Sequence, residues 1–309
     1  MYRYVLKRLL MLIPIIIGVS FVVYSLMALI PGDPVYQVVS EDATEEQIAE
    51  VRAEMGLDKP FIVRYANYML GLLQGDMGKS YISKRPVFDT FMQRFPATLK
   101  LGIASIIFAV ALAIPLGIVS ALRQNTILDT SCSAIAILGM SMPNFWLGLM
   151  LILLFSNRLG WFPSGGDEGF KSLILPAITE GAFLMAFIMR TTRSSMLEVI
   201  RQDYIVTAKA KGVSKGVVIR KHALKNAMIP IITAAGMNFA YVLGGPALTE
   251  TVFSWPGVGR LVVDSMNEKD IPMVTGCLVL STIIVSIVNL LVDILYAYLD
   301  PRIKAQYTK

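Results

Sequence analysis

Charged residues are scarce in this chain. They make up 16% of its 309 residues, whereas hydrophobic residues make up 55%. A soluble domain carries roughly 25% charged residues. No soluble core of this length requires so much apolar surface, so the composition excludes an ordinary soluble domain and predicts an integral membrane protein. The net charge of +6 then becomes a matter of membrane topology and does not by itself indicate nucleic-acid binding.

Cysteine and histidine are rarer still. The two cysteines, Cys132 and Cys277, each lie in an apolar run, which argues against a disulfide. The single histidine is His222, and no Cys/His/Asp cluster has the spacing of metal ligands. The sequence also shows no nucleophile–base pair. We therefore expect no catalytic residue, no metal and no cofactor in this chain, and we do not expect an enzyme.

The sequence contains several long apolar runs. A membrane-spanning helix needs about 20 mostly apolar residues. Six runs qualify: 9–30, 99–122, 133–155, 172–189, 227–248 and 273–298. Packed neighbours can satisfy the carbonyls that a proline frees, so we expect kinked spans at Pro14, Pro115, Pro143, Pro176 and Pro230. The first run is longer than a signal-peptide core and lacks an A-x-A-like cleavage site, so we expect it to be retained.

The lysines and arginines predict the orientation of the spans. With both termini in the cytoplasm, the inside segments hold most of the basic residues, including Arg123, nine between 190 and 225, and Arg302, Lys304 and Lys309 at the tail. The short outside loops hold only Arg158, Lys171, Arg260 and Lys269. This asymmetry follows the positive-inside rule. The predicted units are a tail and first span (1–30), an extracytoplasmic helical segment (31–98) and a membrane core (99–309).

The segment 31–98 is too polar to span a membrane. Thr44 and Gln47 form a capping-box pattern ahead of a helix that Gly56 and Pro60 would end, and a second helix is expected at 86–95. We interpret the segment as a cap on the mouth of the membrane domain, which is compatible with a docking surface for an external partner. Gly78-Lys79-Ser80 resembles the end of a phosphate-binding loop, but the first glycine of that pattern is replaced by Leu73. The chain therefore shows no nucleotide site of its own.

The loop 191–225 is the most distinctive segment. Its region from 190 to 225 holds nine basic residues against Glu198 and Asp203. It reads as two short helices, which Asp203 and Ser214 could cap, separated by Gly212 in a left-handed conformation. One face of the first helix is expected to carry Tyr204, Thr207, Ala208 and Lys211. The charge alone is explained by the positive-inside rule and by anionic lipids, whereas the helix–glycine–helix pattern favours a protein-docking element.

The sequence of the loop 191–225 resembles that of a known family. The loop resembles the E-A-A-x-x-x-G coupling loop of ABC importer permeases, with Val206-Thr207-Ala208 in place of E-A-A and Gly212 as the glycine. The variant T-A-(K/R)-A-K-G followed by H-A-L-(K/R)-N-A is typical of the dipeptide/oligopeptide/nickel permeases, and the order of motifs is most similar to the dipeptide-permease B type. The other matching segments are Pro31–Pro34, Thr192–Val199, Glu250–Arg260, Asn289–Asp293 and Asp300–Arg302.

The resemblance implies an all-α membrane protein with six spans and the type I ABC importer permease architecture. It implies a second homologous permease, two cytoplasmic ATPase subunits that bind ATP and magnesium, and an extracytoplasmic substrate-binding protein. The implied cargo is a dipeptide or oligopeptide, with glutathione-type compounds or nickel as alternatives. The implied ATPase-coupling residues are Tyr204, Thr207, Ala208, Ala210, Lys211, Gly212, His222 and Asn226.

Two polar residues inside spans are candidates for the substrate pathway. Glu180 is a carboxylate at membrane depth, which is costly. It either lines the pathway for a cationic end of the substrate, or is a buried carboxylate that pairs with a neighbouring chain or lies near the interface. Asn289 shares a helix face with Asp293, and an interhelical hydrogen-bonding role is the alternative to a pathway role. Trp255 is expected in a structural turn near the membrane interface. An ion-driven secondary transporter would show more membrane carboxylates and inverted repeats, so it is the less favoured class, as are a membrane enzyme and a purely structural protein.

Overall fold

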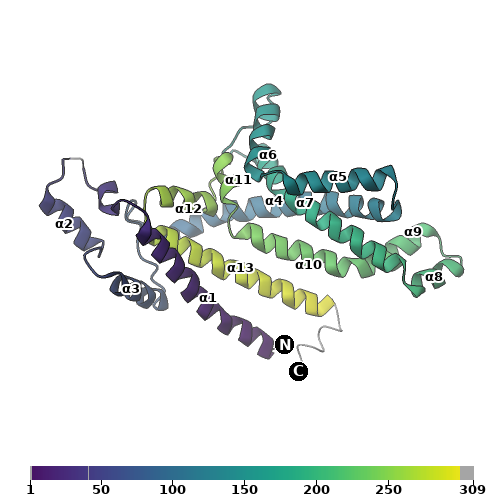
Figure 1. Ribbon diagram of the computed structural model, residues 1–309, viewed down its shortest axis with the longest axis horizontal. Coiled ribbons are helices and arrows are strands. Elements are labelled where there is room, and N and C mark those ends of the chain that lie inside the picture. Colours follow the sequence, from purple (N-terminus) through teal and green to yellow (C-terminus); the bar gives the residue numbers. More distant parts are fainter. Residues whose placement is uncertain (1, 41, 300–309) are drawn as a thin grey trace.

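The computed structural model describes residues 2–40 and 42–299. The predicted basic tail Arg302, Lys304 and Lys309 and the motif 300–302 lie outside these residues. The described chain is helical, and its only strand-like pairing is an isolated bridge between Lys79 and Pro86. The molecule is elongated, with helices α2 (Glu45–Glu54) and α3 (Phe61–Leu73) at one end and α8 (Asp203–Ala210) and α9 (Lys215–Val217) at the other (Figure 1).

Within residues 2–40 and 42–299, five helical stretches are long and apolar enough to cross a membrane. They are α1 (Tyr2–Leu29), α4 (Val87–Leu122), α7 (Phe170–Ile200), α13 (Ile271–Leu299), and the continuous run of α9, η3 (Val218–Ala223) and α10 (Leu224–Leu243). A sixth span exists only if a bent pair of helices counts as one. The expected all-helical membrane fold is confirmed, and the expected spans all correspond to helices in the structure.

The kink expected at Pro143, inside the span predicted at 133–155, is a sharp break between two helices. Helix α5 (Ile127–Ser141) is followed by α6 (Asn144–Leu151) and the π-helical stretch η2 (Ile152–Arg158), and the two halves meet at an angle of 103°. Met142 is extended because a residue before proline is restricted in this way, and Pro143 starts the new helix. Helix α6 therefore points away from the long axis of the bundle (Figure 1).

The fifth span also differs from its predicted range. Helix α10 ends at Leu243, and Gly245 adopts a left-handed φ of +99° before α11 (Ala247–Val252) begins. Residues 247–248, which the apolar pattern placed in the span, thus belong to a separate short helix. A further amphipathic helix, α12 (Val258–Asn267), leads into α13.

The boundary expected at residue 98 falls inside a helix. The short helix predicted at 86–95 is the first part of α4, which continues through Pro96 to Leu122. Proline is tolerated within long helices when neighbouring elements satisfy the freed backbone groups. The segment between α1 and α4 and the bundle therefore share one rigid element.

The segment between α1 and α4 is packed on the bundle. The predicted capping box is confirmed, because Thr44 and Gln47 exchange both side-chain hydrogen bonds at the start of α2. Helix α3, which the sequence analysis missed, lies along α1, where the hydroxyl oxygens of Tyr65 and Ser20 are 3.1 Å apart. The phosphate-loop lookalike has a structural role: Ser80 donates to Asp270, whose carboxylate also accepts from the backbone N–H of Met273 at the start of α13.

Small residues allow α4 and α7 to pack along most of their length. A methyl group on Gly117 would lie 2.6 Å from Cβ of Thr192, and one on Gly181 would lie 2.7 Å from the ring of Phe108. Small residues at such crossings let helix backbones approach closely in membranes. The same two helices contribute many residues to the largest buried apolar cluster.

Candidate functional site

Helix α8 ends in a Schellman motif. Gly212 has φ +79°, and its N–H donates to the carbonyl of Lys209 at 3.0 Å, while the N–H of Val213 donates to the carbonyl of Ala208 at 3.2 Å. These two hydrogen bonds satisfy carbonyls that the helix end would leave unpaired. The left-handed glycine expected between the two short helices is confirmed.

The expected side-chain caps are not formed. Asp203 is the first helical residue of α8, Gln202 occupies the N-cap position, and no side chain caps the helix. Ser214 does occupy the N-cap position of α9, yet its side chain makes no capping hydrogen bond. The glycine therefore positions these helices more than the polar caps do.

The surface of α8 divides into an inward and an outward side. Ile205 is fully buried, and Ala208 packs partly buried against the same apolar cluster. Tyr204 and Val206 are 42% and 57% exposed, and the other exposed residues from Asp203 to Lys211 are Asp203, Thr207, Lys209, Ala210 and Lys211. Ala208 lies at the border between the two sides, because the buried Ile205, three residues earlier, brings it partly against the bundle.

Asn226 connects α8 to the returning chain. Its side-chain Nδ2 donates to the Tyr204 hydroxyl at 2.7 Å and to the carbonyl of His222 at 3.1 Å. His222 itself is half-buried on η3. Sequence spacing could not reveal the Tyr204–Asn226 contact, since the two residues lie 22 positions apart. The structure thus brings Tyr204, His222, Asn226 and the Gly212 turn together in one compact element.

An ion pair behind this element was missed by the sequence analysis. Arg193 of α7 binds Asp129 of α5 in a bidentate manner, with both N–O distances at 2.8 Å. The carboxylate also accepts from the Ser120 hydroxyl at the end of α4 and from the backbone N–H of Asn125. Three helices are therefore fixed to one another next to the base of the loop. Bidentate arginine–carboxylate pairs hold geometry as well as charge.

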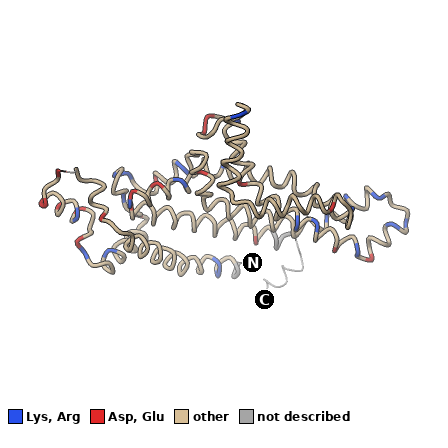
Figure 2. Tube along the Cα trace, turned by 45° about the horizontal axis from the view of Figure 1, so that its top comes forward, with Lys and Arg blue, Asp and Glu red and all other residues tan. Residues whose placement is uncertain are grey.

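Positive charge gathers at this end of the molecule. In Figure 2, lysines and arginines follow the chain around the end formed by α8 and α9. The acidic residues of the loop 191–225 are Glu198 and Asp203. The predicted basic character of the loop is therefore also a property of the exposed surface.

Glu180 is buried at the middle of the bundle. It is 4% exposed and accepts hydrogen bonds from the Thr249 hydroxyl at 2.8 Å and from Nδ2 of Asn144 at 3.3 Å. It lies on the wall of a cavity of about 640 Å³ that also borders Tyr241, Gly245 and Val285, on α10, the turn after it and α13. The three elements that hold Glu180 are α7, the start of α6 and α11.

Asn289 lies apart from Glu180. It borders a smaller cavity of about 240 Å³ between α1 and α13, together with Arg8 and Leu12. One turn further along α13, Asp293 forms an ion pair with Arg8 at 2.8 Å. The structure does not bring the two predicted pathway residues to one site, and the pathway role of Asn289 stays a prediction.

The segment 250–260 forms a buried junction. Trp255 is fully buried in the turn that follows α11, and its indole N–H donates to the carbonyl of Ala97 at 2.9 Å, so the expected structural turn is present. Glu250 accepts from the Thr98 hydroxyl at 2.6 Å and from the backbone N–H of Arg260 at 2.9 Å. Burial raises the pKa of the Glu250 carboxyl, whereas these hydrogen bonds act in the opposite direction. The junction attaches α11 and α12 to α4.

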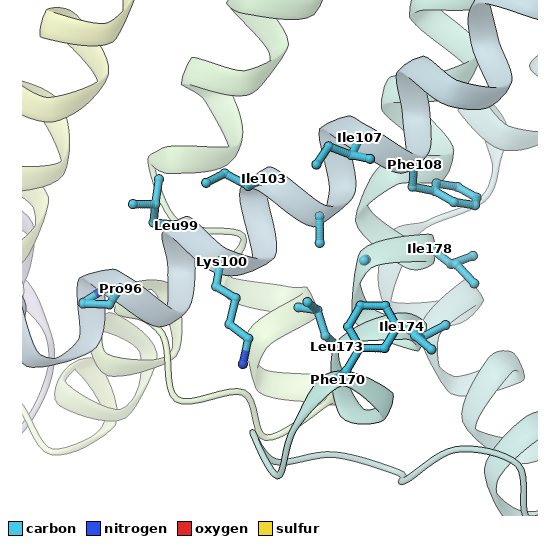
Figure 3. Close-up of a pocket in the computed structure, with 12 residues that line it drawn as sticks. Pro96, Leu99, Lys100, Ile103, Ile107, Phe108, Phe170, Leu173, Ile174 and Ile178 are labelled. Carbon is cyan, nitrogen blue, oxygen red and sulfur yellow. The ribbon is translucent and has the colours of Figure 1, made fainter.

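An apolar groove lies between α4 and α7. It has a volume of about 710 Å³, and Ile103, Ile107, Phe108 and Ile174 are among the apolar side chains that line it (Figure 3). Its polar member, Lys100, forms an ion pair with Asp167 and lies 5.2 Å from the ring centroid of Trp255. Among the described residues, no group of three or more His, Cys, Asp or Glu side chains could hold a metal ion.

Comparisons with known proteins agree with this architecture. The chain is 43% identical to the dipeptide transport system permease protein DppB of Alkalihalophilus pseudofirmus, with 98% of this chain and 100% of that protein covered. It is 42% identical to the glutathione transport system permease protein GsiC of Salmonella choleraesuis, with 98% and 99% covered. DppB of Escherichia coli strain K12 is 40% identical, with 98% and 99% covered.

A solved structure shows the same fold. A chain of the MetNI methionine ABC transporter, in an inward-facing conformation, superposes with a TM-score of 0.60 at 21% identity, covering 69% of this chain and 97% of that chain. The family model for the binding-protein-dependent transport system inner membrane component matches residues 113–305, and the model for its N-terminal part matches residues 1–102. The chain therefore belongs to the binding-protein-dependent transport system inner membrane components, the multi-pass permease subunits of ABC importers, which work with ATPase subunits and a substrate-binding protein.

Proposed function

We propose that this chain is one permease of an ATP-driven importer that moves short peptides into the cell by alternating access. A second, related permease completes the pathway, and two ATPase subunits, which bind ATP and magnesium, dock on the cytoplasmic side against α8 and the Gly212 turn. A binding protein delivers the cargo from outside. In this orientation both termini face the cytoplasm, which the positive charge of the loop 191–225 supports.

The outward surface of α8 carries the proposal. The helix projects at one end of the molecule, exposes Tyr204, Val206 and Ala210, and is held from behind by Ile205 and Asn226. A coupling helix must transmit force from the ATPases to the spans, so it has to be rigid on one side and free on the other. The ion pair between Asp129 and Arg193 supplies a firm base on which such a force can act.

Substitutions at Ala210 test the coupling role. We expect Ala210→Trp to lower cargo-stimulated ATP hydrolysis and uptake in proteoliposomes about tenfold, because one bulky side chain in a close interface costs at least ~1.4 kcal/mol. Ala210→Ser, which stays small, serves as the matched control and should retain both activities. Co-purification of the ATPase subunits reports docking directly. Normal uptake by Ala210→Trp in a complex that assembles normally contradicts the coupling role.

The relatives support a short peptide as cargo. Dipeptide and glutathione permeases each match nearly the whole chain, and glutathione is itself a small peptide. One observation favours the glutathione alternative: the match to GsiC runs over 304 positions, whereas those to the DppB proteins run over 333 and 336, although all cover 98% of this chain. The DppB proteins therefore contain additional residues that have no counterpart in this chain, whereas GsiC aligns with almost no insertions.

Binding to the partner binding protein separates the cargo candidates. A panel of dipeptides, glutathione and nickel is titrated by calorimetry, and each compound that binds is then tested for ATP-dependent uptake by the reconstituted complex. Micromolar or tighter binding of dipeptides, followed by uptake, supports the peptide assignment. Binding of glutathione alone supports the second candidate, and binding of nickel alone contradicts both.

A further inference from the structure

Glu180 is a buried carboxylate inside a long apolar helix of the membrane bundle. The carboxylate lies within α7 and is 4% exposed. An ionisable group inside a span is costly to bury, and such groups commonly mark substrate or ion pathways. An apolar side chain of similar size would fill the same space without that cost.

The partners of Glu180 are neutral. Thr249 and Asn144 each donate one hydrogen bond, and among the ion pairs of the described residues none involves Glu180. A carboxylate has about four acceptor positions, so the two hydrogen bonds leave acceptor capacity unused. No cationic side chain of the described residues forms an ion pair with Glu180, and its carboxylate can accept further hydrogen bonds.

The adjoining cavity has the size and lining of a small-molecule site. Its volume of about 640 Å³ falls within the roughly 300–1,000 Å³ of typical ligand pockets, which combine mostly apolar walls with a few polar groups. Phe145 and Tyr241 contribute partly exposed aromatic surface to its lining, while Glu180 is the acidic member. Such a lining suits a compound that carries one positive group and apolar side chains.

Two chain breaks form the walls of this cavity. One is the 103° bend at Pro143, and the other is the turn of Gly244 and left-handed Gly245 between α10 and α11. Thr249, which hydrogen-bonds to Glu180, is carried by the short helix beyond the second break. A change in the angle at either break would alter the cavity next to Glu180.

From this geometry we propose that Glu180 is a specificity-determining residue that accepts the terminal ammonium group of the peptide cargo during passage. The inference rests on the proposed peptide-importing function and assigns one contact within it. An ammonium group brings three N–H donors and a positive charge, which match the spare acceptor positions and the negative charge of the carboxylate. Cargo with a blocked amino terminus cannot form this ion pair.

The alternative is that Glu180 only holds α11 against α7 through Thr249. Three variants separate the two roles in the complete importer, reconstituted in proteoliposomes with saturating, dipeptide-loaded binding protein. Glu180→Gln removes the charge and keeps the size, Glu180→Asp keeps the charge, and Thr249→Val removes the hydrogen bond while leaving the carboxylate. Uptake and ATP hydrolysis are measured together.

The charge role predicts a distinct pattern. Glu180→Gln should lower dipeptide uptake about tenfold, since a hydrogen bond to a charged group contributes about 1.5–3 kcal/mol. Glu180→Asp and Thr249→Val should stay within about threefold of the unmodified importer, because both variants retain the negative charge and Thr249→Val removes only a single hydrogen bond. Equal losses in Glu180→Gln and Thr249→Val, or normal uptake by Glu180→Gln, overturn the proposal. If the unmodified importer takes up no peptide at all, the proposed function fails, and this assignment with it.

Chemical labelling of Glu180 in the unmodified complex tests the contact even if the variants do not assemble. The unmodified complex in lipid nanodiscs is treated with a hydrophobic carbodiimide, and modification of Glu180 is followed by mass spectrometry. A dipeptide with a free amino terminus should protect Glu180, whereas its N-acetylated form at the same concentration should not. Equal protection by both, or protection by neither, overturns the ammonium contact.

Discussion

At the scale of single residues, Gly212 decides where helix α8 points. Its φ of +79° lies in the left-handed region, and no heavy atom lies within 4 Å of the position that a Cβ would take. A side chain would therefore meet strain from the backbone alone and no steric clash. Left-handed backbone costs roughly 1–2 kcal/mol for most L-residues but is reached more easily by asparagine.

Two substitutions at Gly212 separate backbone conformation from side-chain volume. We expect Gly212→Val to shift α8 and to lower uptake and ATPase co-purification at least fivefold, because a β-branched residue is disfavoured in the left-handed region. Gly212→Asn should keep most of both activities, since asparagine tolerates that conformation. Both variants should insert into the membrane in equal amounts, as measured by immunoblot. Equal activity of the two would argue against a conformational role.

Gly259 illustrates a glycine required by close packing. A Cβ on Gly259 would lie 2.7 Å from the backbone of Ala247, whereas a Cβ on Gly18 of α1 would meet nothing within 4 Å. Gly259→Ala should destabilise the protein by about 1–3 kcal/mol through overpacking of the buried junction.

Gly18→Ala is the matched control and should be neutral or stabilising by about 0.5–1 kcal/mol, as expected for glycine within a helix. Thermal unfolding in detergent can be followed with a thiol-reactive dye, because both Cys132 and Cys277 are buried in the folded protein. A lower melting temperature for Gly18→Ala than for Gly259→Ala would contradict the assignment.

At the scale of elements, the ion pair between Asp129 and Arg193 joins α5 to α7 beside the loop 191–225. The carboxylate is 5% exposed and bound by four donors from Arg193, Ser120 and Asn125. Removing one partner of a buried pair leaves an uncompensated charge, which commonly costs about 3–5 kcal/mol. The pair thus matters for how the helices are held together more than for the net charge of the loop.

Arg193→Gln tests this connection. We expect this substitution to lower the free energy of unfolding by an amount near the lower end of about 3–5 kcal/mol, because Arg193 is partly exposed. We also expect a loss of uptake. The matched control is Arg190→Gln, which removes the same charge from the same helix. Arg190 is exposed and forms no ion pair among the described residues. The free energy of unfolding of this control should stay within about 0.5 kcal/mol of that of the unmodified protein. Similar melting temperatures for the two variants would exclude a structural role for the pair.

At the scale of the whole molecule, the two ends differ in character. One end carries α2 and α3 packed on α1, and the other carries α8, α9 and a concentration of lysine and arginine (Figures 1 and 2). In a membrane this polarity sets which end faces the cytoplasm. The proposed mechanism requires that the basic end faces inward, where ATP is available.

Labelling of introduced cysteines tests the orientation. Lys215 and Gln74 are exposed at opposite ends of the molecule, and the native cysteines are buried. In intact cells, a membrane-impermeant maleimide should modify Gln74→Cys but should modify Lys215→Cys only after the membrane is opened. The reverse pattern would invert the proposed topology.

The elements defined by local chemistry were predicted well. The Thr44 capping box, the left-handed Gly212 and the five long spans follow from patterns within a few residues or from continuous apolar length. The failures have one physical origin. The size of the bend at Pro143 and the end of α10 at Leu243 depend on what packs against each segment, which hydropathy does not encode.

The sequence by itself determined that this is a helical membrane protein, where its long apolar helices lie and which family it belongs to. These properties follow from apolar length, charge asymmetry and contiguous motifs. The tertiary structure alone decided that Asn226 braces Tyr204, that Arg193 pairs with Asp129, and that Glu180 borders a cavity between two chain breaks. The partners in these contacts lie 22 to 69 positions apart in the chain, so the helix packing brings them together and no local pattern predicts them.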